Sequence, residues 1–577
     1  MALQILTDYR WFLPIVTAVA IGLALPSVRA GLCCDDYVVL GILSASDTMR
    51  DIYPSRLDIF NFFDGRPERM RRLLDVGLLP WWTFPEARVA FWRPVSALTH
   101  WLDSTAWRDV PGLMHMQSLL WFGALVVTVT LTYRRLIERT SAALVAALLY
   151  AVDAAHAAAV TTISGRNTIL GALFGTLALL LHDRWRRTGW RAGVMLAPAC
   201  LALGLLSSEG AVAIGGYLVA HSVFLDGGGW RRRLLALLPH AVVVAAWQVL
   251  YTGLGYGVLG AAPGYLNPLR ERLQFAGALA KNGPILLAAQ WTGPPSETFP
   301  TLSPGGAALR WVGAMLILIV IGAMLAPLLR RDPVARFWAL GQTLAVVPIC
   351  AAVPHDRYLF FVGLGAMGLL AQFACSLLDR ESWRTHGRRW RWPAALVACV
   401  LMVLHLVVSP IRLAQSATRA SDAWLERASD SIPTDPVVRH QLVVIVNVAN
   451  PLTVPYSFFI KTVKGQPIPA HTRVLSSGDG PVSVYREDAR TIRIRWQGRQ
   501  DHMFFRAKEQ PMAPRERIRL TGTEIAVTAL TEDGWPTEAT FCFDQNLDDP
   551  ELRWLRWESG SFVGFRPPAV GETIVVR

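Results

Sequence analysis

Long apolar runs alternate with short polar segments from residue 11 to residue 411 of the chain. A helix needs roughly 17 to 25 apolar residues to cross a bilayer. Most of the runs have that length, although those near 141 and 167 are short. The pattern predicts a polytopic helical membrane domain over residues 1–415. The runs, about eleven on this criterion, lie near 11–30, 113–133, 141–155, 167–182, 192–207, 210–225, 234–252, 309–329, 337–353, 358–378 and 393–411.

The pattern changes near residue 420, where apolar and polar residues begin to alternate. Alternation is typical of strands with one buried face, and we predict a β domain of the sandwich kind over residues 420–577. The alternating segments are "QLVVIVNV", "TIRIRW", "RIRLTGTEIAVTAL" and "ETIVVR". An acidic cluster in this domain lacks the DxDxDG spacing of a calcium loop, so we expect a solvated turn at Asp544, Asp548, Asp549 and Glu551.

The arginines gather in every second connection between the apolar runs. Cytoplasmic loops carry an excess of Lys and Arg, so this alternation predicts a cytoplasmic amino terminus. It directs the first loop (31–112), the 253–308 loop and the C-terminal domain outward, as in a multi-pass protein of a bacterial inner membrane. The basic connections contain Arg134, Arg135 and Arg139; Arg184, Arg186, Arg187 and Arg191; Arg231, Arg232 and Arg233; Arg330, Arg331 and Arg336; and Arg380, Arg384, Arg388, Arg389 and Arg391.

Composition agrees with an integral membrane protein. Of the 577 residues, 53% are hydrophobic and 17% are charged, and the mean hydropathy is +0.34. The net charge of +13 does not indicate a nucleic-acid partner, because the arginines lie in short segments and not along one amphipathic face. The 7 cysteines have the spacing of neither a disulfide framework nor a metal site. Residues 1–30 could be a cleaved signal peptide, but the run from Trp11 to Pro26 is long for one, which favours a retained first helix.

Ionisable residues stand at the ends of the runs that the arginine pattern directs outward. Near hydrocarbon such groups are costly and often mark a functional site, although a helix cap or an interfacial anchor would explain any single one. The set that we single out for function is Asp35, Asp36, Arg93, Arg166, Glu209 and Arg357. The other outward members are His100, Asp103, His115, Asp153, His156, His355 and Asp356.

Carboxylates beside arginines at an outward membrane surface suit a reaction on a lipid-linked phosphate. A guanidinium pairs with phosphate oxygens in bidentate fashion and keeps its charge, and a carboxylate near an acceptor hydroxyl can take its proton during attack. The sequence contains no GxxxxGK[ST] phosphate loop and no HExxH zinc helix. A polyprenyl-phosphate sugar would provide both the membrane anchor and a phosphate leaving group.

Six segments occur in an order that resembles the GT-C superfamily of membrane glycosyltransferases. They are "CDDYVVL", "FWRPVSALTHWLD", "MHMQSLLWF", "AAHAAAVTTISGRNTILGALF", "LLSSEGAV" and "HDRYLF". The likeness covers roughly residues 10 to 375 and is greatest to the O-mannosyltransferase-like proteins with tetratricopeptide tails and to their bacterial relatives. The tetratricopeptide tail is absent here, and the β domain takes its place.

The resemblance implies an inverting transferase that uses a polyprenyl-phosphate sugar, with a first-loop aspartate as general base. By position that role falls on Asp36 or Asp35, of which we prefer Asp36. Glu209 belongs to the segment that corresponds to the family's Lys–Glu pair. The resemblance assigns the donor phosphate to Arg93, Arg166 and Arg357, and the orientation of polar groups to His115 and His156. The expected partners are therefore the lipid-linked donor, membrane lipid, and an outward protein or glycan acceptor, and we assign no cofactor.

Three positions depart from the family pattern. Ala158 stands where the family has Glu, Ser208 where it has Lys, and Gln117 where it has Asn. Without that carboxylate and that cation, the residues give no support for a divalent metal, and the identity of the donor sugar stays open. Two alternatives also stay open: a catalytically inactive GT-C-like scaffold and a transporter of lipid-linked sugars. A transporter would be expected to have inverted repeats, which the sequence lacks.

Overall fold

The structure is a computed structural model that describes residues 9–44, 46–262, 264–378, 388–418, 423–478, 480–497 and 504–577. Its contacts divide the chain into two compact units, which are described separately. The unit that holds the C-terminal residues also holds most of the 31–112 loop, a segment that the sequence pattern groups with the membrane domain. Unit 1 comprises Met1–Leu32, Trp92–Gly253 and Gly264–Ala420, and Unit 2 comprises Cys33–Phe91, Leu254–Pro263 and Ser421–Arg577.

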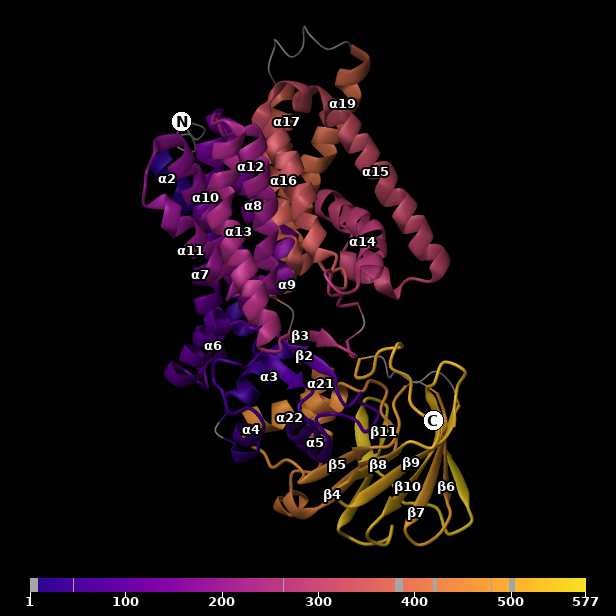
Figure 1. Cartoon of the computed structure of the whole chain (residues 1–577). Helices are drawn as coiled ribbons and strands as arrows, with labels where there is room; N and C mark the ends of the chain where they lie inside the picture. Colours follow the sequence, from indigo (N-terminus) through magenta and orange to yellow (C-terminus); the bar gives the residue numbers. More distant parts are fainter. Residues whose placement is uncertain are drawn as a thin grey trace. The chain divides into compact units, whose positions relative to one another are not determined.

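Unit 1 is helical (Figure 1). Within it α10 packs against α7 and α11, and α12 packs against α16. The helices are α2 (Tyr9–Ala24), α6 (Pro94–Ala106), α7 (Pro111–Leu136), α8 (Thr140–Ala151), α9 (Ala157–Val160), α10 (Arg166–Thr188), α11 (Gly193–Leu205), α12 (Gly215–Phe224), α13 (Trp230–Gly253), α14 (Arg272–Thr292), α15 (Pro304–Arg331), α16 (Pro333–Ile349), α17 (Phe360–Leu377), α19 (Arg388–Val403) and α20 (Ser409–Ala417). Short 3₁₀ turns include η2 (Ala154–His156), η3 (Glu209–Ile214), η4 (Ser296–Thr301) and η5 (Asp356–Tyr358).

Among the described residues, 7 helices are long and apolar enough to cross a membrane. This confirms the predicted multi-pass helical character, whereas the count of about eleven spans is not confirmed. The remaining runs also form helices, but charged residues at both ends of α10 shorten its apolar stretch, and α11, α12 and α16 have only 13, 10 and 17 residues. In the last basic connection, Arg380 and Arg384 lie outside the described residues. The candidate spans are Trp11–Arg29, Pro111–Leu136, Thr140–Val160, Trp230–Gly253, Pro304–Arg331, Phe360–Leu377 and Trp390–Ala417.

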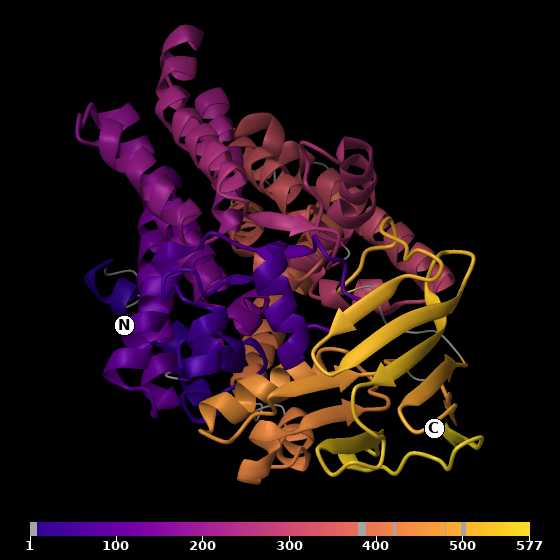
Figure 2. The ribbon, with the colours of Figure 1, turned by 60° about the horizontal axis from the view of Figure 1, so that its bottom comes forward.

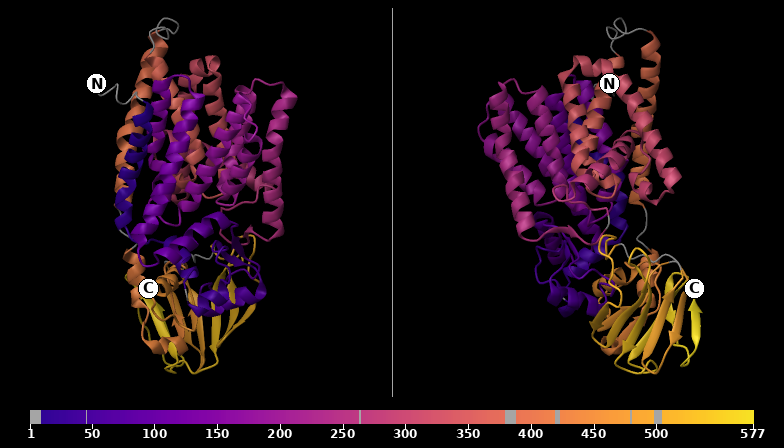
Figure 3. Two further views of the ribbon diagram at one scale, coloured as in Figure 1. Left: turned by 90° about the vertical axis from the view of Figure 1, so that its left-hand side faces the viewer. Right: turned by 45° about the vertical axis from the view of Figure 1, so that its right-hand side comes forward.

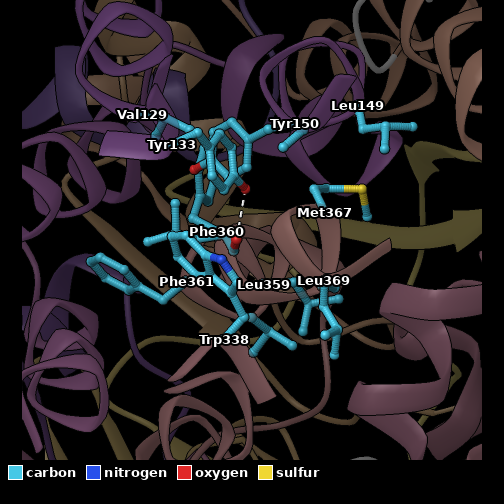
Figure 4. Packing of buried hydrophobic residues seen from close by; sticks show 14 of the residues in the cluster. Val129, Tyr133, Leu149, Tyr150, Trp338, Leu359, Phe360, Phe361, Met367 and Leu369 are labelled. Carbon is cyan, nitrogen blue, oxygen red and sulfur yellow. Dashed lines mark hydrogen bonds between the residues drawn. The ribbon is translucent and has the colours of Figure 1, made fainter. Parts of the chain in front are cut away.

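Aromatic side chains from α7, α8, α16 and α17 fill the core of Unit 1, and Figure 4 shows Tyr133, Tyr150 and Phe360 among them. The rings of Tyr133 and Trp338 lie edge to face, with centroids 5.2 Å apart. The Tyr133 hydroxyl donates a 2.6 Å hydrogen bond to the Leu364 carbonyl, which satisfies its polar end inside the core. Small residues allow this close approach, since a Cβ at Gly365 would lie 2.7 Å from the Trp338 carbonyl oxygen.

The first-loop part of Unit 2 contains short helices and a small sheet. The helices are α3 (Asp35–Ile42), α4 (Asp47–Ile52) and α5 (Pro67–Val76). The antiparallel strands β1 (Asn61–Asp64), β2 (Arg88–Ala90) and β3 (Gly257–Leu259) pair in that order. The third strand comes from the 253–308 loop, so the sheet joins two segments that are far apart in the sequence.

The C-terminal part of Unit 2 has two sheets, whose strands Figures 2 and 3 show from different sides. One is antiparallel, in the order β13-β6-β7-β10-β9-β8, and the other has the order β12-β11-β4-β5. The four alternating segments of the sequence form β4, β7, β8–β9 and β13, which confirms a C-terminal β-sheet domain. The strands are β4 (Leu442–Ile445), β5 (His471–Val474), β6 (Val482–Arg486), β7 (Thr491–Trp496), β8 (Arg517–Leu520), β9 (Thr523–Leu530), β10 (Pro536–Phe543), β11 (Leu552–Glu558), β12 (Ser561–Gly564) and β13 (Thr573–Val576).

The four-stranded sheet differs from what the predicted sandwich-like domain, built of strands alone, would contain. Its strands β4 and β5 are parallel, and a crossover helix, α22 (Thr453–Val463), connects them. Parallel neighbours need such a crossover, and it supplies a helical layer that an all-β sandwich lacks. A second helix, α21 (Ala423–Ser431), packs against α22.

Candidate functional site

Arg93 and Glu209 form an ion pair in Unit 1. Arg93 precedes Pro94, whose fixed φ suits the first position of α6, and Glu209 opens η3. The Arg93 Nε donates to Glu209 Oε2 at 2.8 Å, and the distance from Arg93 Nη2 to the same oxygen is 2.7 Å. A hydrogen bond from the Val95 N–H to the Leu206 carbonyl, at 3.1 Å, holds the two segments together. The family's Lys is missing at Ser208, but Glu209 has Arg93 as its cationic partner.

Arg357 and two tyrosines extend this pair. The Arg357 guanidinium donates to the Tyr358 hydroxyl at 2.8 Å, and the Tyr358 and Tyr265 hydroxyls are 3.5 Å apart. Burial raises the pKa of the Tyr265 phenol, Tyr358 adds to this rise, and the positive charges of Arg357 and Arg93 oppose it. Both guanidiniums therefore act on one side chain. We call Arg93, Glu209, Tyr265, Arg357 and Tyr358 the arginine–tyrosine cluster.

Electrostatics keep Arg93 charged in this setting. Burial works to lower the pKa of Arg93, but the charge and the hydrogen bond of Glu209 outweigh it, so that the pKa is raised. The Arg93 and Glu209 side chains are 17% and 24% exposed, so the pair is reachable from outside the packed core. The cluster holds two guanidiniums against the one Glu209 carboxylate, which leaves one net positive charge.

The carboxyl group of Asp356, next to Arg357, has a raised pKa. Its Oδ1 accepts hydrogen bonds from the Ser296 N–H at 2.9 Å and the Ser296 hydroxyl at 2.7 Å. Burial and the nearby Glu297 raise the pKa of Asp356 to about 6. Burial, with a contribution from Arg357, lowers the pKa of the neighbouring His355 to about 4. Asp356 therefore changes charge near neutral pH, while His355 stays neutral there.

We expect the stability of the protein to fall as the pH rises from about 4 to about 6, through the titration of Asp356. The pKa of this carboxyl is about 6 in the folded protein against 3.8 ordinarily, so within that window the folded state binds more protons than the unfolded state. Melting curves of the wild type and of Asp356→Asn across this range check the effect. The variant should lose this part of the pH dependence, and identical pH profiles would contradict the assignment.

Arg166 lies in a separate, fully buried network. Its Nε donates to the Ser118 hydroxyl at 3.0 Å, and its terminal nitrogens donate to the Met114 carbonyl at 2.8 Å and to the Gln117 side chain. Asp103 Oδ2 lies 2.6 Å from Arg166 Nη2, and the two side chains are 1% and 0% exposed. A phosphate could reach Arg166 only after these bonds break. This geometry supports a role in which Arg166 fixes α6 and α7 against α10, and not the donor-phosphate role that the resemblance implies.

The two predicted histidines also differ in setting. His115 Nε2 donates to the Gly31 carbonyl at 2.8 Å, since a carbonyl only accepts. His156 is fully buried between aromatic rings, stacked on Phe360 with centroids 4.3 Å apart and 4.6 Å from the Tyr150 ring centroid. His115 thus anchors the chain just before the aspartate doublet, and His156 is a packing residue of the core in this geometry.

The aspartate doublet belongs to Unit 2, where it forms the first turn of α3. Asp36 is fully buried, and its Oδ2 accepts the Cys33 N–H at 3.2 Å. Asp35 is exposed, and its Oδ1 accepts the Tyr456 phenol at 2.6 Å. Cys34, between Cys33 and the doublet, has a φ of +37°, a conformation rare for residues other than glycine. The two carboxylates therefore have different surroundings, although they are neighbours in the sequence.

The acidic cluster of the C-terminal domain is held by arginines. Asp548 lies 2.7 Å from an Arg486 guanidinium nitrogen, and Asp544 lies 2.8 Å from one of Arg519. The predicted turn thus contains paired carboxylates. Among the described residues, no group of three or more His, Cys, Asp or Glu side chains is arranged to hold a metal ion.

Sequence reasoning missed the tyrosines of both units. Tyr265 lies in the 253–308 loop, where no motif marks it, and Tyr456 lies on α22, in a segment predicted to be β structure. Tyr358 stands next to Arg357 within "HDRYLF", so its position was available as a signal. The structure pairs Arg93 with Glu209, puts Tyr265 within the electrostatic reach of both Arg93 and Arg357, and places Arg166 in a separate network of Unit 1.

No family model matches the chain, and no curated protein matches its sequence. Among solved structures, the chain is similar to two structures of an oligosaccharyltransferase from Archaeoglobus fulgidus. One, tethered with an acceptor peptide containing the NVT sequon via a disulfide bond, has a TM-score of 0.39 and 12% identity over 81% of this chain. The other, AglB in complex with an inhibitory peptide and a dolichol-phosphate, has a TM-score of 0.42 and 13% identity over 81% of this chain.

The chain spans 64% and 65% of the lengths of those two structures. Both are structures of an oligosaccharyltransferase, and a particular closeness to the O-mannosyltransferase-like proteins is not shown. At such low identity this likeness concerns the fold alone.

Proposed function

We propose that this protein is a membrane glycosyltransferase that transfers a sugar from a polyprenyl phosphate to an acceptor outside the cytoplasm. The observation that carries the proposal is the arginine–tyrosine cluster, in which the guanidiniums of Arg93 and Arg357 both lie within electrostatic reach of Tyr265. Guanidiniums bind phosphate oxygens in a fixed fork and stay charged. A polyprenyl-phosphate sugar is a phosphodiester with one negative charge, which complements the one net positive charge of the cluster.

In the proposed reaction Asp36 takes the proton of the acceptor hydroxyl as its oxygen attacks the anomeric carbon. The bond from that carbon to the phosphate oxygen breaks, and polyprenyl phosphate leaves with the electron pair. The attack inverts the configuration at the anomeric carbon. Because the leaving phosphate gains negative charge, the guanidiniums of Arg93 and Arg357 bind it more strongly in the transition state than in the substrate.

Asp36 is the better candidate for the base within the doublet. Its bond from the Cys33 N–H fixes the carboxylate in one orientation, and a fixed base suits catalysis. Asp36 is fully buried, so the proposal requires the residues that cover it to move aside when the acceptor binds. Asp35 is exposed and already accepts the Tyr456 phenol. We propose that Asp35 positions α3 against α22 through this bond.

Arg357→Gln should lower kcat/KM for the lipid-linked donor by about 10- to 100-fold, the value of a charge-assisted hydrogen bond. The variant removes a phosphate ligand and leaves the Arg93–Glu209 pair intact. Initial rates at several donor concentrations measure the effect. Arg270→Gln is the control, because Arg270 is an exposed arginine in the same loop as Tyr265. An equal loss in both variants would point to general electrostatics and against a phosphate site.

The function itself is tested by mass spectrometry of envelope glycans and proteins from cells with and without the gene. Loss of one hexose from one class of molecule would identify the acceptor. Unchanged profiles would favour the inactive scaffold, which the departures at Ala158 and Ser208 keep open. If the protein were a transporter, its loss would change how much lipid-linked sugar lies on each side of the membrane. The sugar would stay bonded to its lipid phosphate, and no glycosyl product would form.

A further inference from the structure

An open groove lies in Unit 1 between the ends of α12 and α15 and the start of α16. Its volume is about 480 Å³, within the range of about 300–1,000 Å³ that is usual for ligand sites. Most of its lining is apolar and includes Phe224, Leu329 and Leu340, and the lining also contains two arginines, Arg330 and Arg336. We call this hollow the α15–α16 groove.

The α15 wall of the groove belongs to the lipid-facing side of that helix. Helix α15 is long and apolar enough to cross a membrane, and its Leu316 and Ile319 side chains are 59% and 60% exposed. In a bilayer such side chains contact acyl chains, which are as apolar as leucine. Ala326 and Arg330 follow Ile319 by 7 and 11 positions, a spacing that puts all three on one face of a helix with 3.6 residues per turn. An acyl chain of the bilayer can therefore enter the groove from the side.

The two arginines of the groove are placed to bind an anion. Both are exposed, and within the described part of the chain the Arg330 guanidinium has no hydrogen-bond or ion-pair partner. The Arg336 guanidinium lies over the Phe224 ring, 5.2 Å from its centroid. This contact uses the face of the guanidinium and leaves its N–H groups available at the edge. Guanidinium N–H groups match the oxygens of a phosphate.

The aspartates next to these helices do not neutralise the groove. One oxygen of Asp332 caps the N-terminus of α16 at 2.7 Å, and the other accepts the Gln372 amide at 2.7 Å. Asp226, which follows α12, accepts from the Arg186 guanidinium at 2.7 and 3.1 Å. Residues 330–336 contain three arginines and one aspartate, a net charge of +2. The groove therefore combines an apolar wall with a positive rim.

Other arginine-rich connections lie at the same end of Unit 1 as the groove. Arg135 of α7 pairs with Asp183 of α10. Arg186, also on α10, pairs with Asp226, which follows Phe224 of the groove by two positions. Cytoplasmic loops carry the excess of arginine, so the arginine pattern predicts that this end faces the cytoplasm. Anionic phospholipids give that side of a membrane its negative surface.

We propose that the α15–α16 groove binds an anionic phospholipid, with an acyl chain against the apolar wall and the phosphate on Arg330 and Arg336. Basic pockets between membrane helices on the cytoplasmic side bind lipid head groups in this way. The site is separate from the arginine–tyrosine cluster. Helix α16 has 17 residues and spans about 25 Å from its start, near Arg336, to its end, after which the chain leads to Arg357. The inference thus goes beyond the proposed function and does not depend on it.

The test is native mass spectrometry of the purified full-length protein, titrated with phosphatidylglycerol or with phosphatidylcholine of the same acyl chains. We expect the wild type to bind phosphatidylglycerol about 30-fold more tightly, at roughly fivefold for each arginine. Arg330→Gln and Arg336→Gln should each weaken phosphatidylglycerol binding about fivefold and leave phosphatidylcholine binding unchanged. Thr343→Trp fills the groove at an exposed lining position without changing its charge, and it should weaken the binding of both lipids.

Arg191→Gln is the matched control. Arg191 is an exposed arginine of another basic connection and does not line the groove, so its replacement should leave lipid binding unchanged. Excess glycerol 3-phosphate should not displace phosphatidylglycerol, because it has the phosphate but no acyl chain. Four results would each overturn the inference: equal affinity of the wild type for both lipids, phosphatidylglycerol binding that neither arginine variant changes, an equal loss in Arg191→Gln, or displacement by glycerol 3-phosphate.

Discussion

Asp36→Asn is expected to reduce sugar transfer by about 10³-fold, the usual contribution of a general base, without loss of folded protein. The Asn side chain has the same shape, and its Oδ1 can still accept the Cys33 N–H that Asp36 accepts at 3.2 Å. An amide cannot take the proton of the acceptor hydroxyl at neutral pH. Complementation of cells that lack the gene, with the missing glycan quantified by mass spectrometry, measures the loss.

Asp35→Asn is the matched control for this prediction. It changes the neighbouring carboxylate, whose Oδ1 accepts the Tyr456 phenol, and Asn keeps an acceptor there. We expect transfer to stay within about tenfold of the wild type, since no proton transfer is lost. Full complementation by Asp36→Asn, together with loss in Asp35→Asn, would move the base to Asp35. Full complementation by both would support the scaffold.

Arg166→Met is expected to destabilise the protein by about 3–5 kcal/mol, the cost of breaking a buried ion pair by removing one partner. The substitution leaves the Asp103 carboxylate, which is 1% exposed, without its 2.6 Å partner. It also leaves the Met114 carbonyl without the guanidinium donor. Burial already raises the pKa of Asp103, and Arg166 opposes that rise. Thermal unfolding in detergent measures the loss as a lower melting temperature.

Arg184→Met on the same helix is the control for Arg166. Arg184 is exposed and lies over the Trp190 ring at 4.5 Å, so we expect a change of about 0.5 kcal/mol or less. Arg166→Met combined with Asp103→Leu should recover part of the stability, because an apolar pair leaves no buried charge. Equal melting temperatures for Arg166→Met and the wild type would contradict the role of Arg166 in fixing α6 and α7 against α10. That result would restore Arg166 as a candidate for binding the donor phosphate.

Hydropathy predicted the multi-pass helical character well, because burial in hydrocarbon constrains composition directly. The count of spans was harder to predict. Helix α10 carries charged residues that a protein-lined environment satisfies, as in the hydrogen bond from His221 Nε2 to Asp183 at 2.9 Å. Alternation also predicted strands such as β7 and β9 correctly, since their burial alternates along the chain.

Residue identity alone could not separate a phosphate arginine from a structural one. Arg93, Arg166 and Arg357 all stand at run ends that the arginine pattern predicts to face outward, and only their contacts distinguish them. Arg166 is enclosed by α6 and α7 residues that lie 48 to 67 positions away, a separation at which sequence pattern carries no information. The helix α22 was missed for a similar reason, because the short apolar segment "TVPYSFFIKTV" has no periodicity that separates a helix from a strand.

The most direct measurement uses the purified full-length protein in vesicles loaded with a polyprenyl-phosphate hexose that carries a radiolabel in the sugar. An extract of envelope proteins and glycans provides the acceptor. The proposal predicts that label moves from the lipid into the extract, that free polyprenyl phosphate appears in equal amount, and that Asp36→Asn protein does neither. Label that stays on the lipid with the wild-type protein, or moves equally with Asp36→Asn, would contradict the account.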